Sequence, residues 1–433
     1  MKNKNHILFL SFILFFCFPP FLIGQEYFNE NFIRYTNYIY KPNIKTVLLY
    51  KKGFELSLPI INLNKSEQLE LSFDDFETNV KDYYYTIIHC DANWTPTDII
   101  NSEYITGFTE DRVTEYKYSI NTVQSYINYK ITFPNENLNI SKSGNYIIKV
   151  FEDFDKDNLV LTQRFVVTED IIDINVKVKR NTIAENLFTK HEIDFSLNTK
   201  NLNINNAKED IKIILSQNNR WDNSIINLKP SFISQTELTY DYYEENTFFS
   251  GNEYRYFSIK SLYYYSERID EITRTIQKND VYLFKDMPRR YLQYDSYQDI
   301  NGKRVINIQD KDNSSIEADY TWVHFSLDYP NPLVNGNLYV FGELTNWNIG
   351  NDNKMKYNYD KKCYEVSLYL KQGYYNYEYV YLDDSSKVLD NTFIEGSFYQ
   401  TENDYTVYVY YKEPGKYYYR LIGVKQVNTK DFY

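Results

Sequence analysis

The sequence predicts an all-β protein built from three consecutive β-sandwiches. The first observation behind this prediction is that apolar and polar residues alternate with a period of two along most of the 433 residues, whereas helical periodicity is scarce. The second is the abundance of aromatic residues, with 47 tyrosines and 28 phenylalanines. Aromatic side chains fit the pleated, half-buried surface of a sheet. Turn signals separate the short strands, as in an antiparallel sandwich.

The amino terminus has the order of a secretory signal peptide. Lys2 and Lys4 precede an apolar run over residues 7–18. Gly24 is a small residue at a suitable distance for cleavage, so residues 1–24 are predicted to be the signal peptide. An uncleaved membrane anchor is the less favoured alternative, because the run is shorter than the ~20 residues needed to span a bilayer.

Residues 25–168 are predicted to form the first sandwich. One strand is expected at residues 68–74, with Leu69, Leu71 and Phe73 on the same face. Polar turns separate it from the strands that follow along the chain. Those strands are expected at residues 83–91, 126–133, 145–151 and 160–167.

The pattern starts again after Thr168, which predicts a second sandwich over residues 169–290. A segment rich in proline, arginine and tyrosine at 287–298 indicates a linker, and the third sandwich is predicted over residues 291–433. The strands expected in the second sandwich lie at residues 171–178, 191–197, 211–216, 254–265 and 281–284.

Composition excludes several classes of protein. The chain has a net charge of −12 and no clustered lysine and arginine, so a nucleic-acid partner is not expected. Beyond the signal peptide no segment is apolar enough for a membrane-spanning helix. Cys90 and Cys363 lie in different predicted sandwiches, which favours two buried thiols over a disulfide.

Several blocks of the first sandwich go beyond general β patterning. In this order and spacing they resemble the amino-terminal domain of the type IX secretion system plug protein family, and IIHCDANW followed by TPTD is the most specific part. The blocks read LSLPIINLNKSEQLELSFDD (56–75), YYYTIIHCDANWTPTDI (83–99), EYITGF (103–108), YKITFPN (129–135), SGNYIIKVF (143–151) and LTQRFVV (161–167).

The resemblance implies a function that involves no catalysed reaction. Members of this family occupy the periplasmic mouth of the giant outer-membrane barrel through which folded cargo is secreted, and they close it when no cargo is engaged. For this chain the resemblance implies a periplasmic protein on the inner side of the outer membrane, whose partner is that translocon barrel. It implies no cofactor and no small-molecule substrate.

The most specific motif also has an interpretation from its residues alone. His89 and Cys90 are neighbours on a strand and point to opposite faces, which argues against a metal pair or a cysteine nucleophile. A buried core histidine followed by a structural corner is the favoured interpretation. Asn93 and Trp94, in the turn after this strand, are the alternative: candidate contacts with a protein partner.

The third sandwich resembles the early-set immunoglobulin-like domain of glycogen-binding modules. The shared features are the strand ending at Gly342, the turn with Asn346 and Trp347, and Gly373 before a tyrosine-rich strand. In those modules a tryptophan of this turn and a second one in the next hairpin bind sugar. Trp347 matches the first and the second has no counterpart, so the resemblance implies the fold and not sugar binding. Trp347 is retained as a candidate contact residue.

No motif indicates an enzyme. The compact histidine spacing of zinc enzymes and the G-x-S-x-G turn of serine hydrolases are both missing from the sequence. The acidic segment 153–157 has the opening of a calcium loop, but Asn158 and Arg164 stand where glycine and glutamate are required, so a hairpin turn is expected. The sequence therefore predicts no catalytic, cofactor or metal site.

Two functional hypotheses remain beside the plug protein. The second hypothesis is a periplasmic carbohydrate-binding or scaffold module, and the third is a hydrolase with a carboxylate pair across strands.

Overall fold

The computed structural model describes residues 32–432, so the predicted signal peptide lies outside the described residues. The predicted all-β fold is confirmed, since several mainly antiparallel sheets make up the described chain. Within residues 32–432, no helix is long and apolar enough to cross a membrane. The helices of this part are α2 (Asn101–Tyr104), α3 (Ala207–Asp210), α4 (Ser314–Glu317) and α5 (Thr392–Glu395), and short 3₁₀ turns lie at Ala184–Asn186, Glu343–Thr345 and Thr429–Asp431.

The first sandwich packs two sheets around one core. One sheet has the order β1-β12-β11-β5-β7, with β3 parallel to β12, and the other has the order β2-β4-β9-β8. Leu69, Leu71 and Phe73 of β4 are fully buried in this core, as predicted. The strands are β1 (Tyr38–Ile39), β2 (Ile44–Lys51), β3 (Ile60–Asn62), β4 (Leu69–Asp75), β5 (Tyr83–Cys90), β6 (Ile105–Gly107), β7 (Glu110–Arg112), β8 (Glu115–Tyr118), β9 (Ile127–Phe133), β10 (Leu138–Ile140), β11 (Gly144–Glu152) and β12 (Leu159–Thr168).

The second sandwich combines strands from two distant parts of the chain. One sheet has the order β13-β14-β18-β17, with β19 also on β14, and the other has the order β16-β15-β30-β31. Its strands are β13 (Asp173–Arg180), β14 (Lys190–Asn198), β15 (Ile211–Gln217), β16 (Ile225–Ile226), β17 (Phe232–Ile233), β18 (Glu237–Tyr240), β19 (Thr247–Phe249), β30 (Asp404–Tyr411) and β31 (Arg420–Asn428).

The third sandwich is built around the long strand β28. This strand pairs with β20, β23, β25 and β29, and the facing sheet has the order β21-β22-β24-β27-β26. The strands are β20 (Arg255–Ser258), β21 (Ile269–Arg274), β22 (Asn279–Leu283), β23 (Arg304–Ile306), β24 (Tyr320–Asp328), β25 (Gly336–Phe341), β26 (Lys356–Asn358), β27 (Cys363–Lys371), β28 (Gly373–Asp383) and β29 (Leu389–Asp390).

The strand pairing does not follow the predicted division of the chain into a second sandwich over residues 169–290 and a third over residues 291–433. β30 pairs with β15 over the whole length of β15, so the last two strands complete the second sandwich. The third sandwich is thus inserted between β19 and β30. Strands β20 and β22, expected to close the second sandwich, pair with β28 and β24 instead. A period of two tells which face of a strand is buried but not which strand lies beside it.

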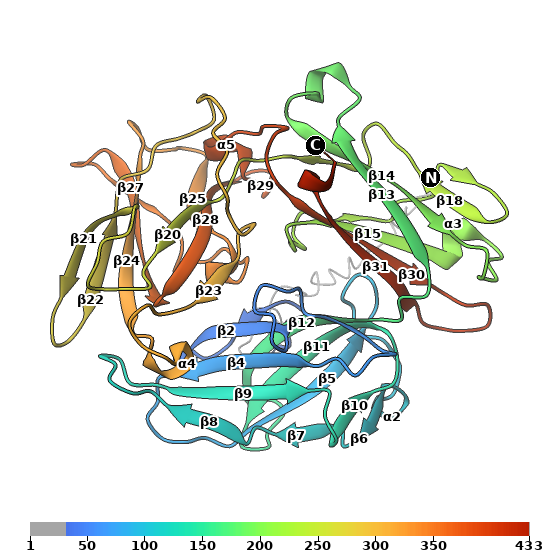
Figure 1. Ribbon diagram of the computed structural model, residues 1–433, viewed down its shortest axis with the longest axis horizontal. Coiled ribbons are helices and arrows are strands. Elements are labelled where there is room, and N and C mark those ends of the chain that lie inside the picture. Colours follow the sequence, from blue (N-terminus) through green and yellow to red (C-terminus); the bar gives the residue numbers. More distant parts are fainter. Residues whose placement is uncertain (1–31, 433) are drawn as a thin grey trace, which may run out of the picture.

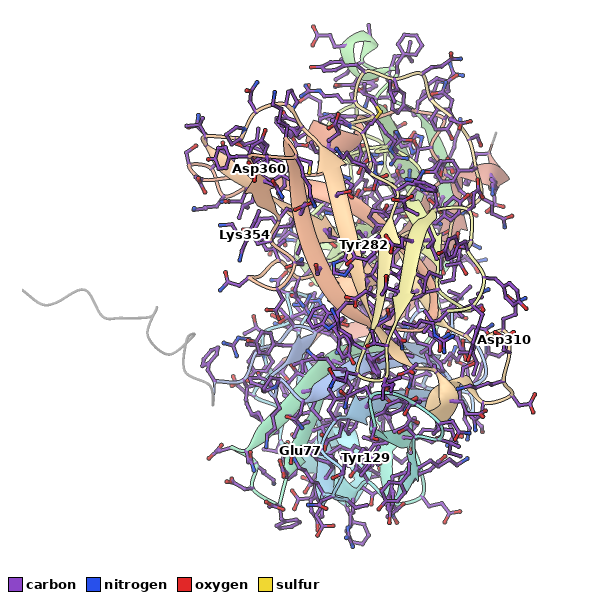
Figure 2. The ribbon with its side chains drawn as sticks, turned by 90° about the vertical axis from the view of Figure 1, so that its left-hand side faces the viewer. Glu77, Tyr129, Tyr282, Asp310, Lys354 and Asp360 are labelled. Carbon is purple, nitrogen blue, oxygen red and sulfur yellow. The ribbon has the colours of Figure 1, made fainter. Side chains whose placement is uncertain are left out.

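The three sandwiches lie around a common centre, and each contacts the other two. Figure 1 shows the first sandwich at the bottom, the inserted third sandwich on the left and the second sandwich on the right. Figure 2 views the molecule from the side of the third sandwich, with Tyr282 near the middle of the outward-facing sheet and Lys354 toward one of its edges.

A buried ionic cluster joins the first sandwich to the third. The carboxylate of Asp74, on β4, accepts hydrogen bonds from Lys371 Nζ at 2.6 Å and from the Tyr320 hydroxyl at 2.6 Å. Its other oxygen accepts a bond from the Asn128 side chain at 2.8 Å. Asp74 and Lys371 are almost completely buried. A buried charge without its partner is costly, so this cluster favours one relative position of the two sandwiches.

The other two junctions are also polar and buried. Arg220, in the loop after β15, forms a buried ion pair with Glu378 of β28 at 3.0 Å, which connects the second and third sandwiches. The Tyr410 hydroxyl of β30 donates to Asn145 Oδ1 of β11 at 2.7 Å, which connects the second and first. All three sandwiches are therefore linked by buried polar contacts in addition to the chain itself.

Candidate functional site

The turn after β5 carries the predicted contact residues Asn93 and Trp94. The side chain of Asp91 shapes this turn, because its Oδ1 accepts the backbone N–H groups of Asn93 at 2.8 Å and Thr95 at 2.9 Å. Trp94 adopts a positive φ of 65°. The geometry turns the Trp94 side chain inward and leaves Asn93 exposed.

Trp94 packs against the second sandwich rather than facing solvent. Its ring lies edge-on to Trp221 with the centroids 4.8 Å apart, and the guanidinium of Arg164 sits 4.4 Å above it. Only 6% of Trp94 is exposed, so its ring is not accessible to an external partner in this structure. Trp221 is far away in the sequence, and no local signal indicates this pairing.

Trp347 is half-buried and packs against side chains of its own sandwich. Its ring contacts Phe341 and Tyr254, with centroids 5.4 and 6.2 Å away. Gly302, at a φ of 78°, lies against the ring so closely that a Cβ atom there would collide with it. Contacts with its own chain therefore occupy part of the ring surface that a sugar would need for stacking. Trp94 and Trp347 both take part in contacts between or within the sandwiches.

His89 is a buried core histidine, as the sequence indicated. Its ring nitrogens bond the Thr97 hydroxyl at 2.8 Å and the carbonyl oxygen of Ser143 at 3.2 Å. Burial lowers the pKa of His89 to about 4 and raises the pKa of the Cys90 thiol to about 12. The histidine is thus neutral and the thiol protonated at neutral pH, and neither is suited to nucleophilic catalysis.

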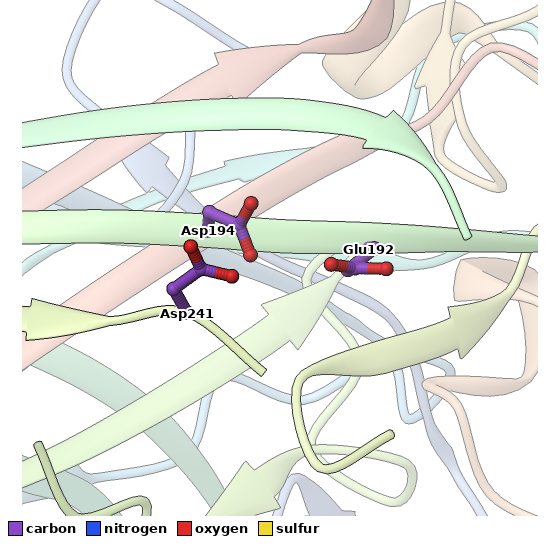
Figure 3. A group of neighbouring side chains, drawn as sticks. All are labelled: Glu192, Asp194 and Asp241. Carbon is purple, nitrogen blue, oxygen red and sulfur yellow. The ribbon is translucent and has the colours of Figure 1, made fainter. Parts of the chain in front are cut away.

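One group of carboxylates in the described chain is close enough to bind a metal ion. It consists of Glu192 and Asp194 on β14 with Asp241 beside them (Figure 3). Lys179 of β13 pairs with Glu192 at 3.0 Å and with Asp194 at 2.6 Å. Burial alone would lower the pKa of Lys179, but its hydrogen bonds to Asp194 and Glu192 raise it. A lysine ammonium group therefore supplies the positive charge that a metal would bring.

The acidic segment 153–157 lies in the turn between β11 and β12, as the sequence predicted. The backbone N–H groups of Asp155 and Asn158 close this turn on the carbonyls of Glu152 and Asp155, at 3.1 and 3.0 Å. Ordinary hairpin contacts thus account for this segment.

The loop between β20 and β21 exposes three consecutive tyrosines, and we name residues 263–265 the tyrosine loop. The exposed fractions of Tyr263, Tyr264 and Tyr265 are 66, 69 and 61%. Arg274 lies 3.9 Å from the ring of Tyr263 and donates a hydrogen bond to its hydroxyl at 3.1 Å. Ile276, in the turn after β21, is 97% exposed. Tyrosine and arginine are the residue types that most often anchor protein interfaces.

The tyrosine loop was missed by the sequence analysis, which assigned residues 254–265 to one strand. The strand β20 ends at Ser258 instead. The available signal was the run of three tyrosines itself, since a half-buried strand with a period of two does not expose three large aromatic residues in succession.

The comparisons with known proteins match one domain and the whole chain. Residues 44–169 match the family model described as type 9 secretion system plug protein 1st domain. No curated protein matches the chain. A crystal structure of a hypothetical protein from Parabacteroides merdae is similar, with 34% sequence identity and a TM-score of 0.88. The match covers 92% of this chain and 100% of that one, so the similarity extends over all three sandwiches.

Proposed function

The chain belongs to the type 9 secretion system plug protein family, and from this premise we propose that it binds and closes the outer-membrane translocon barrel of type IX secretion from the periplasmic side. A role in type IX secretion rests on the family match over residues 44–169. The observation that supports the finer proposal is the joining of three sandwiches by buried polar junctions. Closing a wide pore requires a bulky body that keeps its shape, and it requires no reaction.

The tyrosine loop is the surface that we propose contacts the barrel. Exposed aromatic residues that lose their hydration on binding supply much of the affinity of protein interfaces. The loop presents Tyr263, Tyr264 and Tyr265 beside Arg274, all on the inserted sandwich. Asn93 remains a weaker candidate contact, because it is exposed on the first sandwich.

A pull-down of the tagged protein from its native envelope in mild detergent tests the function. We expect a single very large outer-membrane barrel to copurify in near-equal amount. The barrel reconstituted in a planar bilayer should conduct without the protein and lose most of its conductance when the protein is added. Recovery of the protein without a barrel would reject the proposal.

A variant of the tyrosine loop tests the contact surface. Replacing Tyr263, Tyr264 and Tyr265 by serine should reduce recovery of the barrel at least about tenfold, because two or more aromatic anchors are lost. The control variant is Phe232→Ser with Tyr243→Ser, which removes equally exposed aromatic residues from the second sandwich. Equal barrel recovery by both variants would exclude the tyrosine loop while leaving the function itself intact.

The hypothesis of a carbohydrate-binding module at Trp347 has less support. The ring that would stack on a sugar is packed on Gly302, Phe341 and Tyr254. In calorimetric titration with glycogen or maltoheptaose, we therefore expect no binding heat that is lost in Trp347→Ala.

A further inference from the structure

An open hollow of about 540 Å³ lies at one edge of the outward-facing sheet of the third sandwich. It is formed by strands β26 and β27 and by the turn that precedes β26. This volume is typical of sites for small ligands. Its polar lining includes Asn351, Asp352, Lys354, Lys356, Glu365 and Ser367.

The hollow is lined by two lysines, Lys354 and Lys356, in a chain whose net charge is −12. Lys354 and Lys356 are two residues apart along an extended segment, so they point to the same side. Among the described residues, neither lysine side chain makes a hydrogen bond or ion pair. Glu365 is already paired with Lys361 at 2.9 Å and accepts a bond from the Asn358 side chain at 2.9 Å. Two ammonium groups thus face the hollow without a partner, against the single unpaired carboxylate of Asp352.

The lining selects a ligand with many hydroxyl groups. Amides, hydroxyls and charged groups surround the hollow, and Val366 is its one aliphatic lining residue. An apolar ligand would leave these groups without hydrogen bonds, which is costly. The hydroxyl of Ser367 is held in place, because it bonds His324 Nδ1 at 2.7 Å while His324 Nε2 bonds Asp280 at 3.0 Å. The site therefore offers prearranged donors and acceptors.

The same face of the sheet extends the hollow toward an aromatic residue. Tyr282, His324 and Ser367 are cross-strand neighbours on β22, β24 and β27, and Lys356 lies opposite Glu365 on β26. Neighbouring strands are about 4.8 Å apart, so the row from β22 to β26 is about 14 Å long. Tyr282 stacks on His324 with ring centroids 4.3 Å apart and remains 40% exposed. A ligand lying across the strands would reach from the lysines to this ring (Figure 2).

We propose that this hollow binds an acidic oligosaccharide. The acidic group, a carboxylate or a phosphate, pairs with Lys354 and Lys356. The ring hydroxyls bond Ser367 and the amide and carboxylate groups of Asn351 and Asp352, and a further sugar ring contacts the exposed edge of Tyr282. This site lies on a different face from Trp347 and is independent of the proposed plug function.

Calorimetric titration of the mature protein with tetragalacturonic acid tests the proposal. We expect measurable binding that weakens with added salt, because ion pairs at an exposed site are screened. The double variant Lys354→Ala with Lys356→Ala should lower the affinity at least about tenfold. Tyr282→Ala should lower it less, about twofold to fivefold. Lys387→Ala, an exposed lysine of the same sandwich outside the hollow, is the matched control and should bind as the wild type does.

Three results would overturn the proposal. The first is no binding of tetragalacturonic acid at low salt. The second is binding that the double lysine variant leaves unchanged, which would place the site elsewhere. The third is that maltotetraose or inorganic phosphate binds as tightly as tetragalacturonic acid. Equal affinity for neutral maltotetraose would mean that the acidic group is not recognised, and equal affinity for phosphate alone would mean that the sugar is not recognised. None of the four residues changed in these three variants is buried, and equal thermal unfolding of each variant and the wild type checks that they fold.

Discussion

Buried tyrosines at the level of single residues explain much of the unusual composition. Many of the largest fully buried side chains are tyrosines, and most of their hydroxyls find partners inside the molecule, with Tyr240 an exception. Tyr377 and Tyr379 both donate to one oxygen of Asp286, at 2.7 and 2.8 Å, while Arg255 and Arg268 bond its other oxygen at 2.8 Å. A buried tyrosine fills the core with its ring and needs a hydrogen-bond acceptor for its hydroxyl. The buried tyrosines are therefore structural, whereas the three tyrosines of the tyrosine loop are exposed.

Asp299 makes the stability of the fold depend on pH. Burial raises the pKa of its carboxyl to about 7, the backbone N–H of Asn301 opposes this rise, and the neighbouring carboxylate of Glu253 adds to it. Since this pKa lies above the ordinary value of about 4, the folded state favours the protonated carboxyl. The contribution to stability is complete below about pH 4 and is lost as the pH rises through about 7.

We expect Asp299→Asn to remove this dependence, because the amide stays neutral. In urea unfolding, the stability advantage of the wild type over the variant should shrink by roughly 1–3 kcal/mol between about pH 5 and about pH 8. Asp360→Asn, which changes an exposed acid in the turn before β27, is the control. A difference between wild type and Asp299→Asn that is equal at both pH values would contradict the assignment.

At the level of elements, β30 and β31 decide the boundary of the second sandwich. Val409 of β30 is opposite Ile213 of β15, and both are fully buried in the same core. This pairing closes a sheet across almost 200 residues of sequence. The inserted sandwich therefore has to fold within a loop whose two ends are held by its neighbour.

Val409→Ala should destabilise the second sandwich by roughly 2 kcal/mol, because it removes two buried methyl groups and leaves a cavity. Hydrogen exchange is the measurement: amides of β13, β14 and β15 should exchange faster, with little change in β24 and β27. Val388→Ala, at an exposed position of the third sandwich, should have no such effect. Faster exchange confined to the third sandwich would show that β30 belongs to it in solution.

At the scale of the whole molecule, buried polar contacts link the three sandwiches. The cluster of Asp74, Lys371 and Tyr320 is buried where the first and third sandwiches meet. Burial lowers the pKa of Lys371, and the nearby carboxylate of Asp74 opposes that effect. A body that closes a pore has to resist bending at these junctions, so the cluster connects stability with the proposed function.

Lys371→Ala should cost roughly 3–5 kcal/mol, because it leaves the carboxylate of Asp74 buried without its cation. We expect a lower urea midpoint and, in small-angle scattering, a larger radius of gyration as the sandwiches separate. Lys361→Ala, at an exposed lysine in the turn before β27, is the control. The double variant Asp74→Asn with Lys371→Met should lose less stability than Lys371→Ala, because it leaves no buried charge without a partner. Unchanged scattering and stability in Lys371→Ala would mean that the cluster does not hold the junction.

Four features could be predicted from the residues alone: the all-β class, the buried faces of strands such as β4, the core position of His89 and the family of the first domain. These follow from local alternation and from a motif that is contiguous in the chain. Three other features became visible in the folded chain: β30 pairs with β15, Trp94 packs on Trp221, and Lys354 and Lys356 line a hollow together with Ser367. The two groups differ because a strand pattern indicates which side chains are buried, whereas partners distant in the sequence are selected by packing of the whole chain.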